Sequence, residues 1–270
     1  MKRLAYYAAL YAGFFRAALL SNIQYRASGA IWMIGSILEP TIYLVVWSTV
    51  AESRGGDVGG YTASEFAAYY IVLMMVNHLT FSWIMQVFQF RIQFGSLSYE
   101  LLRPVHPIHA DIMDNIAFKL VQMTLMIPAM IVLILLFEPA FDFSMADLVI
   151  ALPVIVLAFL TRFLLEWSLA LAAFWTTRTI AINNMYFAVM MFVSGRIAPI
   201  ALLPAWLRGT AEVLPFYYVV AFPAELINGS LSRDEIVSGV TMLMVWLVLA
   251  WLLMNILWQR AVRNFSAVGA

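Results

Sequence analysis

The sequence predicts an all-α integral membrane protein with six transmembrane helices, and three observations lead to that prediction. Hydrophobic residues make up 64% of the 270 residues and charged residues only 11%, whereas a soluble domain carries about 25% charged residues. Six segments are apolar over about 20 residues each, the length that a helix needs to cross a bilayer. The connections between these segments are short, so we expect one transmembrane domain over residues 1–270.

The first element is predicted to be a helix that lies in the membrane interface. Its apolar run begins at Leu4 and stops at Arg16 after about a dozen residues, which is too short to span a bilayer. A signal peptide would also start with charge and an apolar run, but no clear cleavage site with small residues precedes Arg26. The cations of residues 1–26 favour contact with anionic lipid headgroups; they are Lys2, Arg3, Arg16 and Arg26.

The six spans follow within residues 27–258, and a short tail, residues 259–270, ends the chain. We expect the spans at about residues 27–51, 65–90, 111–137, 148–175, 185–199 and 236–258. Residues 199–235 are too apolar for a loop in water, and their four prolines exclude one spanning helix. We therefore expect two short re-entrant helices there, with backbone that is covered by protein or lines a wet cavity.

The distribution of Lys and Arg predicts the orientation. One side of the predicted spans carries nine of these residues: Lys2, Arg3, Arg16, Arg26, Arg91, Arg103, Arg178, Arg260 and Arg263. The other side carries three: Arg54, Arg208 and Arg233. Because the richer side faces the cytoplasm, both termini, residues 91–109 and the turn at 176–184 are expected there. The acidic loop at 138–147 and the re-entrant region are expected outside.

Residues 91–109 form a polar interruption between the second and third spans. Within it, Leu97, Leu101 and Leu102 share one face of a short helix. Ser96 or Ser98 can cap this helix, and Pro104 and Pro107 end it. From spacing alone two interpretations remain open: a helix that docks to a partner protein, or an ordinary loop on the lipid headgroups.

Four ionisable residues are expected at membrane depth, where an unpaired charge is costly. Arg162 and Glu166 are four residues apart, so they share a helix face and can pair. Glu39 and Arg196 carry opposite charges and can pair across helices. Both a structural role for these pairs and a place on a transport pathway remain open.

Other polar residues are predicted to have structural roles. Lys119 lies nearer the cytoplasmic end of its span, where it can reach the interface or meet Asp111 or Asp114. Asn77 and His78 favour hydrogen bonds between helices.

The sequence indicates no catalytic or metal site. It has no cysteine and no His-Glu-x-x-His pair, and no Ser/His/Asp set is visible at membrane depth. His106 and His109 have no third ligand nearby in the sequence. The formal net charge of zero gives no indication of a nucleic-acid partner.

Two runs of sequence and the predicted topology carry a family resemblance. The first run is Gly95-Ser-Leu-Ser-Tyr-Glu-Leu-Leu-Arg-Pro104, after the second span. The second, more specific run is Ser194-Gly-Arg-Ile-Ala-Pro-Ile-Ala-Leu-Leu-Pro-Ala-Trp-Leu207 followed by Leu214-Pro-Phe-Tyr-Tyr218. With the interfacial helix and six spans, nearly the whole chain resembles the permease subunits of type-2 ABC exporters.

This resemblance implies a half-transporter: two permease subunits, identical or related, pair in the lipid bilayer, and each sits on a separate ATP-binding cassette subunit. It assigns the coupling helix that enters the ATPase to residues 91–109, with Gly95, Leu97, Glu100, Leu101, Arg103 and Pro104. It assigns an outward roof over the pathway to Pro199, Pro204, Trp206, Pro215 and Tyr217. Neither Lys2 nor Lys119 lies in a phosphate-binding loop, so ATP and Mg²⁺ are expected in the partner and no cofactor on this chain.

The implied function is ATP-driven export of a hydrophobic or amphiphilic substrate, such as a drug, a lipid or a lipid-linked glycan, across a bacterial inner (plasma) membrane. The alternative is a stand-alone membrane protein, such as a gradient-driven carrier. A carrier often has broken half-helices in matching positions of two halves, and here only the region after the fifth span is visibly broken.

Overall fold

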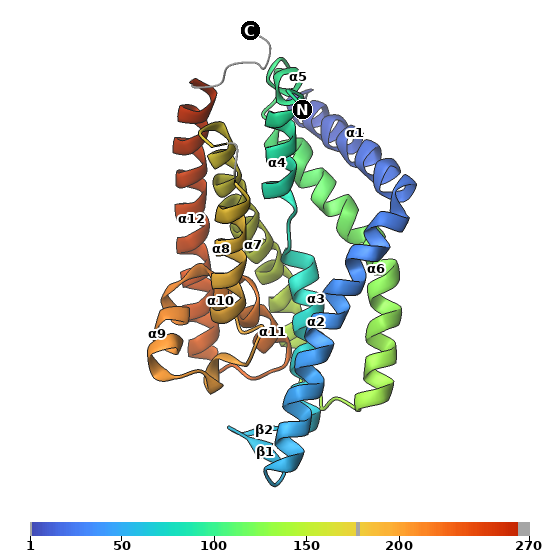
Figure 1. Cartoon of the computed structure of the whole chain (residues 1–270), viewed down its shortest axis with the longest axis vertical. Helices are drawn as coiled ribbons and strands as arrows, with labels where there is room; N and C mark the ends of the chain where they lie inside the picture. The colour runs from blue at the N-terminus through green and yellow to red at the C-terminus, as the bar shows by residue number, and fades with distance from the viewer. Residues whose placement is uncertain (1, 177–178, 264–270) are drawn as a thin grey trace.

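Long helices run side by side along the long axis of the molecule (Figure 1). The structure, a computed structural model, describes residues 2–176 and 179–263, so Arg178, which was counted on the cytoplasmic side, lies outside the described residues. The chain is almost entirely helical. The sheet that the described residues contain is one short hairpin, β1 (Asp57–Val58) and β2 (Tyr61–Thr62), in the glycine-rich turn after the first span.

Five helical segments are long and apolar enough to cross a membrane. They are α2 (Arg26–Ser53), α3 (Ala63–Thr80) with α4 (Ile84–Gln93), α6 (Ile108–Phe137), α7 (Met145–Ala170) with the 3-10 turn η1 (Leu171–Phe174), and α12 (Arg233–Arg263). They coincide with the predicted first, second, third, fourth and sixth spans.

The predicted fifth span corresponds to a shorter helix. This helix, α8 (Ile180–Val193), has 14 residues, which at 1.5 Å per residue cover about 21 Å of a hydrocarbon core about 30 Å thick. It begins five residues earlier than predicted and ends before the Gly195 turn. The structure thus supports five spanning helices by length, and a sixth is not confirmed.

Three of the long helices begin with the same capping box. In each, the hydroxyl oxygen of a Ser or Thr accepts a hydrogen bond from the backbone amide three residues later. The carboxylate of that later residue accepts a hydrogen bond from the backbone amide of the Ser or Thr. The pairs are Thr62 with Glu65, Ser144 with Asp147, and Ser232 with Glu235. Each cap stabilises its helix start by about 1 kcal/mol. All three lie at the end of the molecule that was predicted to face outward.

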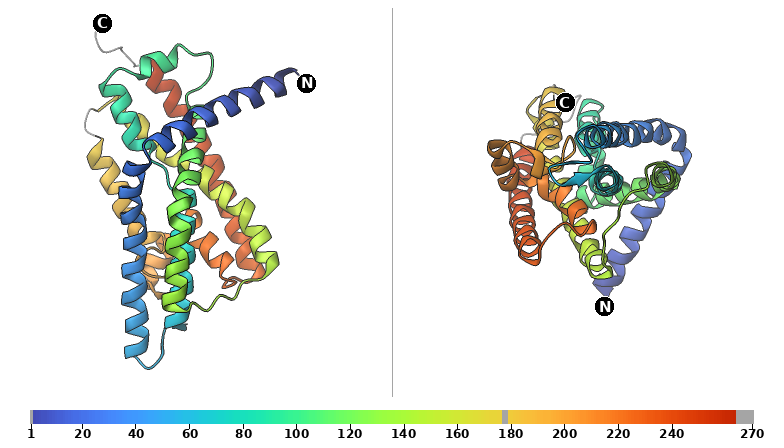
Figure 2. Two further views of the ribbon diagram at one scale, coloured as in Figure 1. Left: turned by 90° about the vertical axis from the view of Figure 1, so that its right-hand side faces the viewer. Right: turned by 90° about the horizontal axis from the view of Figure 1, so that it is seen from below.

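The first helix, α1 (Lys2–Gln24), is inclined to the long helices and crosses α6 (Figure 2). Tyr11 Oη and His109 Nδ1 are 2.6 Å apart, and the Asn22 amide donates to Asp114 Oδ1 over 3.3 Å. The start of α1 lies at the same end of the molecule as the end of α12 (Figure 1). This arrangement fits the prediction of two termini on one side.

The core is centred on α3, which packs against α2, α6, α7 and α11. Its buried side chains include Phe66, Tyr69 and Tyr70. In contrast, α2, α6 and α12 keep many large apolar side chains exposed, among them Ile34, Leu135 and Val248. Apolar exposure of this kind on long helices is expected where the surrounding medium is lipid.

The proline-rich region contains more helices than predicted. After Gly195 come the 3-10 turn η2 (Ile200–Leu202), α9 (Ala205–Val213), α10 (Pro215–Val219) and α11 (Ala221–Ile227). The two predicted short helices are therefore three. Pro204 is the N-cap of α9 and Pro215 is the first residue of α10, and Val220, whose dihedral angles are not helical, separates α10 from α11. All seven residues of α11 are buried, where it packs between α3 and α7.

Candidate functional site

A five-residue helix, α5 (Leu97–Leu101), lies in the stretch that was predicted to dock a partner. Gly95, before it, has φ +70°, a conformation that favours glycine. Leu97 is fully buried, so it holds α5 to the rest of the chain and does not face a partner. Tyr99 and Leu102 are instead 74% and 83% exposed. These two side chains form the accessible apolar surface of α5.

The other predicted residues of this stretch surround α5. Leu101 is half-buried, and Arg103 and Pro104 are exposed. The predicted serine cap is wrong: Ser96 forms no capping hydrogen bond, and its hydroxyl donates to the carbonyl of Arg91 over 3.4 Å.

Ion pairs tie α5 to the long helices. Arg91 Nη2 lies 2.6 Å from Asp111 Oδ1, and Arg91 Nε lies 3.3 Å from Glu100 Oε1. Trp167 Nε1 donates to Asp111 Oδ2 over 3.0 Å. Burial raises the pKa of Glu100, although the Arg91 guanidinium opposes that shift. The buried carboxylate of Asp111 therefore joins α4, α5, α6 and α7 at one point.

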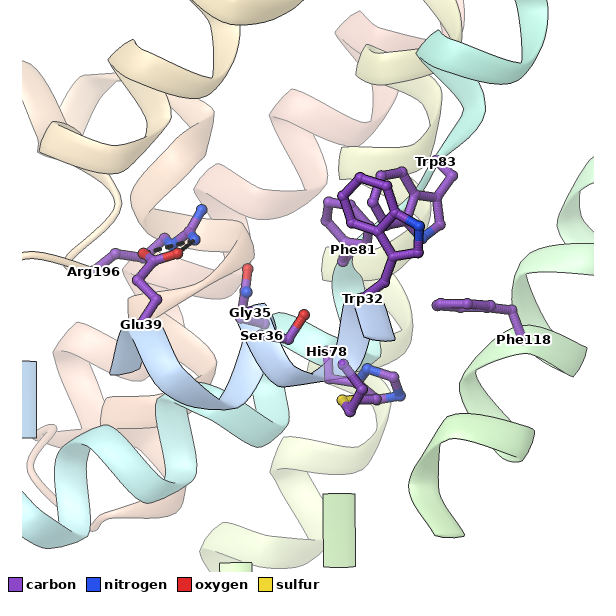
Figure 3. A pocket seen from close by; sticks show the side chains of 11 residues that line it. Trp32, Gly35, Ser36, Glu39, His78, Phe81, Trp83, Phe118 and Arg196 are labelled. Atoms are coloured by element: carbon purple, nitrogen blue, oxygen red, sulfur yellow. Dashed lines mark hydrogen bonds and ion pairs between the residues drawn. The ribbon is translucent and has the colours of Figure 1, made fainter. Parts of the chain in front are cut away.

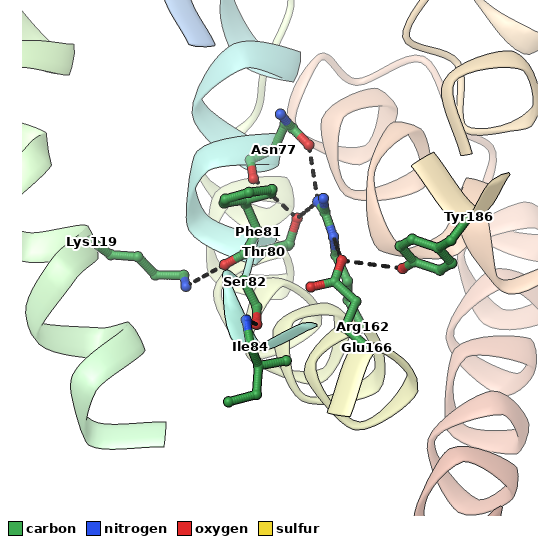
Figure 4. Close-up of polar contacts among 9 residues, drawn as sticks. All are labelled: Asn77, Thr80, Phe81, Ser82, Ile84, Lys119, Arg162, Glu166 and Tyr186. Atoms are coloured by element: carbon green, nitrogen blue, oxygen red, sulfur yellow. Dashed lines mark hydrogen bonds and ion pairs between the residues drawn. The ribbon is translucent and has the colours of Figure 1, made fainter. Parts of the chain in front are cut away.

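The second span is broken between α3 and α4 at Phe81, Ser82 and Trp83. The backbone groups freed by the break have partners: the carbonyl of Phe81 accepts from Lys119 Nζ over 2.6 Å, and Ser82 Oγ accepts from the amide of Ile84 over 3.2 Å. Lys119 was expected to reach the interface or to meet Asp111 or Asp114. Its actual role is to satisfy this broken helix (Figure 4).

The pair predicted from four-residue spacing is present beside the break. Arg162 Nε lies 2.9 Å from Glu166 Oε1, and neither side chain is exposed to solvent. Arg162 Nη1 also donates to Asn77 Oδ1 and Thr80 Oγ1 over 2.9 and 3.1 Å, which crosses from α7 to α3 (Figure 4). The hydroxyl of Tyr186 donates to Glu166 Oε1 over 3.2 Å. The pair thus holds α3, α7 and α8 together.

The second predicted pair, Glu39 with Arg196, lies on an open cavity. Arg196 Nη2 donates to both carboxylate oxygens of Glu39, over 2.8 and 2.6 Å. The Glu39 side chain is 34% exposed and that of Arg196 is 17% exposed. The cavity measures about 240 Å³ (Figure 3). Aromatic side chains line its other end: Trp32, Phe81, Trp83 and Phe118.

This cavity and the buried pair share two residues. Asn77 and Phe81 line the cavity, while Asn77 accepts from Arg162 and the Phe81 ring lies 5.2 Å from the Arg162 guanidinium carbon. His78, a further lining residue, bonds through Nε2 to the carbonyl of Lys119 over 3.2 Å, so the predicted hydrogen bonds of Asn77 and His78 between helices are confirmed. A ligand in the cavity would touch the residues that surround the helix break.

The residues predicted to form the outward roof lie in η2, α9 and α10 or directly before them, in the half of the molecule away from α5 (Figure 1). Pro199 and Pro215 are buried, whereas Pro204 and Trp206 are exposed. The hydroxyl of Tyr217 donates to Glu225 Oε2 over 2.6 Å. Around Gly195, whose φ is +85°, a side chain would collide with the Tyr69 hydroxyl. That hydroxyl donates to the carbonyl of Gly195 over 2.8 Å, which fixes the roof to α3.

Sequence reasoning missed four residues that the folded chain brings into these sites. Asp111 and Arg91 are 20 residues apart and meet only through the turn between α4 and α6. Trp32 and Trp83 meet edge to face, with ring centroids 4.9 Å apart. A tryptophan near the end of a span is a recognisable signal, because indole rings favour the membrane interface. Nothing in the sequence predicted, however, that Trp32 and Trp83 would meet.

The arrangement supports binding of a molecule in the cavity. Within residues 2–176 and 179–263, no group of three or more His, Asp or Glu side chains could hold a metal ion. The cavity combines a neutral ion pair with aromatic rings. Such a surface suits a molecule with one polar and one apolar part.

Comparison with known proteins identifies the family. None of the curated proteins matches the chain. A family model described as "ABC-2 family transporter protein" matches residues 37–269, from the middle of α2 to beyond the end of α12. This match covers most of the chain, confirms the resemblance drawn from the sequence, and agrees with five helices long enough to span a membrane. The chain belongs to the ABC-2 family of transporter proteins.

Proposed function

We propose that this chain is the permease subunit of an ATP-driven exporter, and that a separate ATP-binding cassette subunit docks on α5. The observation that carries the proposal is a set of large apolar side chains exposed along α4 and α5. They are Phe90, Phe94, Tyr99 and Leu102. Exposed apolar surface that continues from the end of the second span onto the polar stretch after it is typical of a protein interface. Glu100 and Arg103, beside it, supply the polar rim that such interfaces have.

The contacts behind α5 provide a route for movement. A push on α5 reaches α4 through the Arg91–Glu100 pair and reaches α6 and α7 through Asp111. At the other end of α4, the break at Phe81–Trp83 is a natural hinge, because the Phe81 carbonyl and the Ile84 amide bind side chains in place of helical backbone partners. Movement of α4 about this hinge would change the cavity that Phe81 and Trp83 line.

The Glu39–Arg196 cavity is our proposed part of the export pathway. Glu39 is 14 residues from the outward end of α2, which places it about 21 Å from that end and inside the hydrocarbon core. Charges at this depth are rare unless they face a polar cavity or another protein. A second permease copy facing α2 would enclose the cavity. The aromatic rings would contact the apolar part of an amphiphilic substrate and the ion pair its polar part.

The end of the molecule that carries α5 is proposed to face the cytoplasm of a bacterial plasma membrane. Most of the Lys and Arg residues outside the spans lie at that end. ATP is available on that side only. Export would therefore run from the α5 end toward the roof formed by α9, α10 and α11.

The test is ATP hydrolysis by the permease reconstituted in lipid with candidate ATP-binding cassette subunits from the same organism. We expect the subunits to copurify and Leu102→Asp to abolish the stimulation of hydrolysis by the permease. Val213→Asp is the control, because Val213 is also well exposed but lies at the roof end. A chain that purifies without any ATPase, or stimulation that survives Leu102→Asp, would contradict docking on α5 and favour a gradient-driven carrier.

A further inference from the structure

An apolar groove is lined by residues of α1, α2 and α6. Figure 2 shows that α1 meets α2 and crosses α6 in this region. Its volume is about 610 Å³, within the range of about 300–1,000 Å³ that is usual for small-molecule sites. The lining residues of α1 and the start of α2 are Leu19, Ile23, Arg26, Ala27 and Ala30. Those of α6 are Leu120, Val121, Gln122, Thr124 and Leu125. The groove therefore belongs neither to the proposed pathway nor to α5.

Tight packing of α2 on α6 forms the bottom of the groove. The Gln122 side chain is buried against Gly29, where even one added carbon would collide with its amide nitrogen. Gln122 Oε1 has no hydrogen-bond partner among the described residues. Above this contact the small side chains of Ala27 and Ala30 leave the groove open.

The charge that lines the groove is positive. Arg26 is the charged member of its lining, is exposed, and forms no ion pair with the described residues. The chain has four cations and no carboxylate before Glu39. On α6, the Asp114 carboxylate contacts α1 but already accepts from Asn22. Arg26 is thus available to an anion.

The depth of these residues matches the shape of a lipid. Arg26 begins α2, 27 residues before Ser53, so it lies about 40 Å from the outward end and beyond a hydrocarbon core of about 30 Å. The apolar side chains that line the groove lie on the hydrocarbon-core side of Arg26. An amphiphile that binds here would have its anionic part at Arg26 and an apolar chain between α2 and α6.

We propose that this groove binds one anionic phospholipid from the leaflet on which α1 lies, with the lipid phosphate at Arg26. The inference does not depend on the export function. Bound lipid would fill the angle between α1 and α2 and hold the inclined helix in place against α6.

The test is native mass spectrometry of the full-length protein, titrated separately with phosphatidylglycerol and phosphatidylcholine of identical acyl chains. We expect about fivefold more single-lipid adduct with phosphatidylglycerol, the factor that one cation near an anionic headgroup contributes. Arg26→Gln should abolish this preference. Arg16→Gln is the matched control, because Arg16 is an exposed cation of the adjoining helix α1 that does not line the groove, and it should keep the preference.

A second variant tests the groove itself. Ala27→Trp fills the apolar part and should lower the adducts of both lipids while leaving the helical content unchanged; it decides the question alone if Arg26→Gln does not fold. Equal adducts of both lipids on the unchanged protein would overturn the proposal. So would equal losses of preference in Arg16→Gln and Arg26→Gln, because binding would then reflect general attraction to α1, and so would unchanged adducts in Ala27→Trp.

Discussion

Two ion pairs predicted at membrane depth, Arg162–Glu166 and Glu39–Arg196, differ in what surrounds them. Arg162 and Glu166 lie on one helix, have no exposed surface, and share their hydrogen bonds with Asn77, Thr80 and Tyr186. Glu39 and Arg196 come from distant parts of the chain and keep part of their surface open on a cavity. The first pair is built into the packing of three helices, whereas the second is accessible to a ligand. Charge at membrane depth therefore has two roles here.

The depth of the buried Arg162–Glu166 pair supports a structural role for it. Arg162 is the eighteenth residue of α7, and α3 also has 18 residues before the break at Phe81. Both therefore lie about 27 Å from the capped ends, near the far edge of a hydrocarbon core about 30 Å thick. The buried pair stabilises the place where the second span is interrupted.

The largest expected effect is loss of the buried pair. Arg162→Leu leaves the Glu166 carboxylate buried without its cation, so we expect the free energy of unfolding to fall by about 3–5 kcal/mol. Unfolding in graded denaturant would measure the change. Replacing both residues, as Arg162→Met with Glu166→Leu, should recover much of the loss because no buried charge remains. A small change in the single variant would show that water reaches this pair.

Glu225 sharpens the comparison, because it is a buried carboxylate for which no ion pair is found among the described residues. Burial raises its pKa from 4.5 to about 7, against the hydrogen bond from Tyr217. Between these pH values the folded protein keeps a proton that the unfolded chain releases, so stability should fall as pH rises. The full loss, roughly 3 kcal/mol, is reached above pH 7.

Thermal unfolding between pH 4.5 and 8 would test this prediction. Glu225→Gln should flatten the profile, and Glu212→Gln, an exposed change in the same region, should leave it unaltered. Tyr217→Phe should move the fall to higher pH, because the phenol stabilises the ionised carboxylate. A profile that is unchanged in Glu225→Gln would assign the pH dependence to other groups.

The smallest expected effect on stability is loss of the open pair. Arg196→Gln leaves Glu39 beside a cavity that water or a polar partner can enter, so the free energy of unfolding should fall by no more than about 1 kcal/mol. The same denaturant titration would measure it, with Arg162→Leu as the reference. A loss as large as that of Arg162→Leu would mean that the cavity is dry and that both pairs are structural.

Hydrophobicity and length predicted most of this fold because they are properties of single segments. The bounds of α2, α6 and α12 were predicted to within about five residues, and the Arg162–Glu166 pair followed from spacing on one helix. The break at Phe81-Ser82-Trp83 could not be predicted in this way, since it contains neither glycine nor proline. Its cause is tertiary: Lys119 binds the Phe81 carbonyl, which a continuous helix would bond internally, while Arg162 binds the side chains of Asn77 and Thr80 on the turn before the break.

The candidate sites were predicted less completely for the same reason. The stretch at residues 91–109 was singled out by its polarity, but the face of α5 that is open to a partner depends on which leucine the fold buries. Leu97 and Leu102 are equivalent by composition. Only the tertiary packing around α5 makes Leu97 internal and Leu102 exposed.

Cysteine labelling of the assembled transporter tests most directly whether the open pair lies on a pathway driven by the ATPase. The chain has no cysteine, so Ser36→Cys in the cavity can be labelled alone with a water-soluble thiol reagent. Ile34→Cys is the control, because residues two apart point to nearly opposite sides of a helix. We predict that Ser36→Cys reacts, that its rate changes several-fold when ATP is trapped in the partner subunit, and that Ile34→Cys stays unlabelled. Equal rates in both nucleotide states, or no reaction at Ser36→Cys, would contradict the proposed pathway.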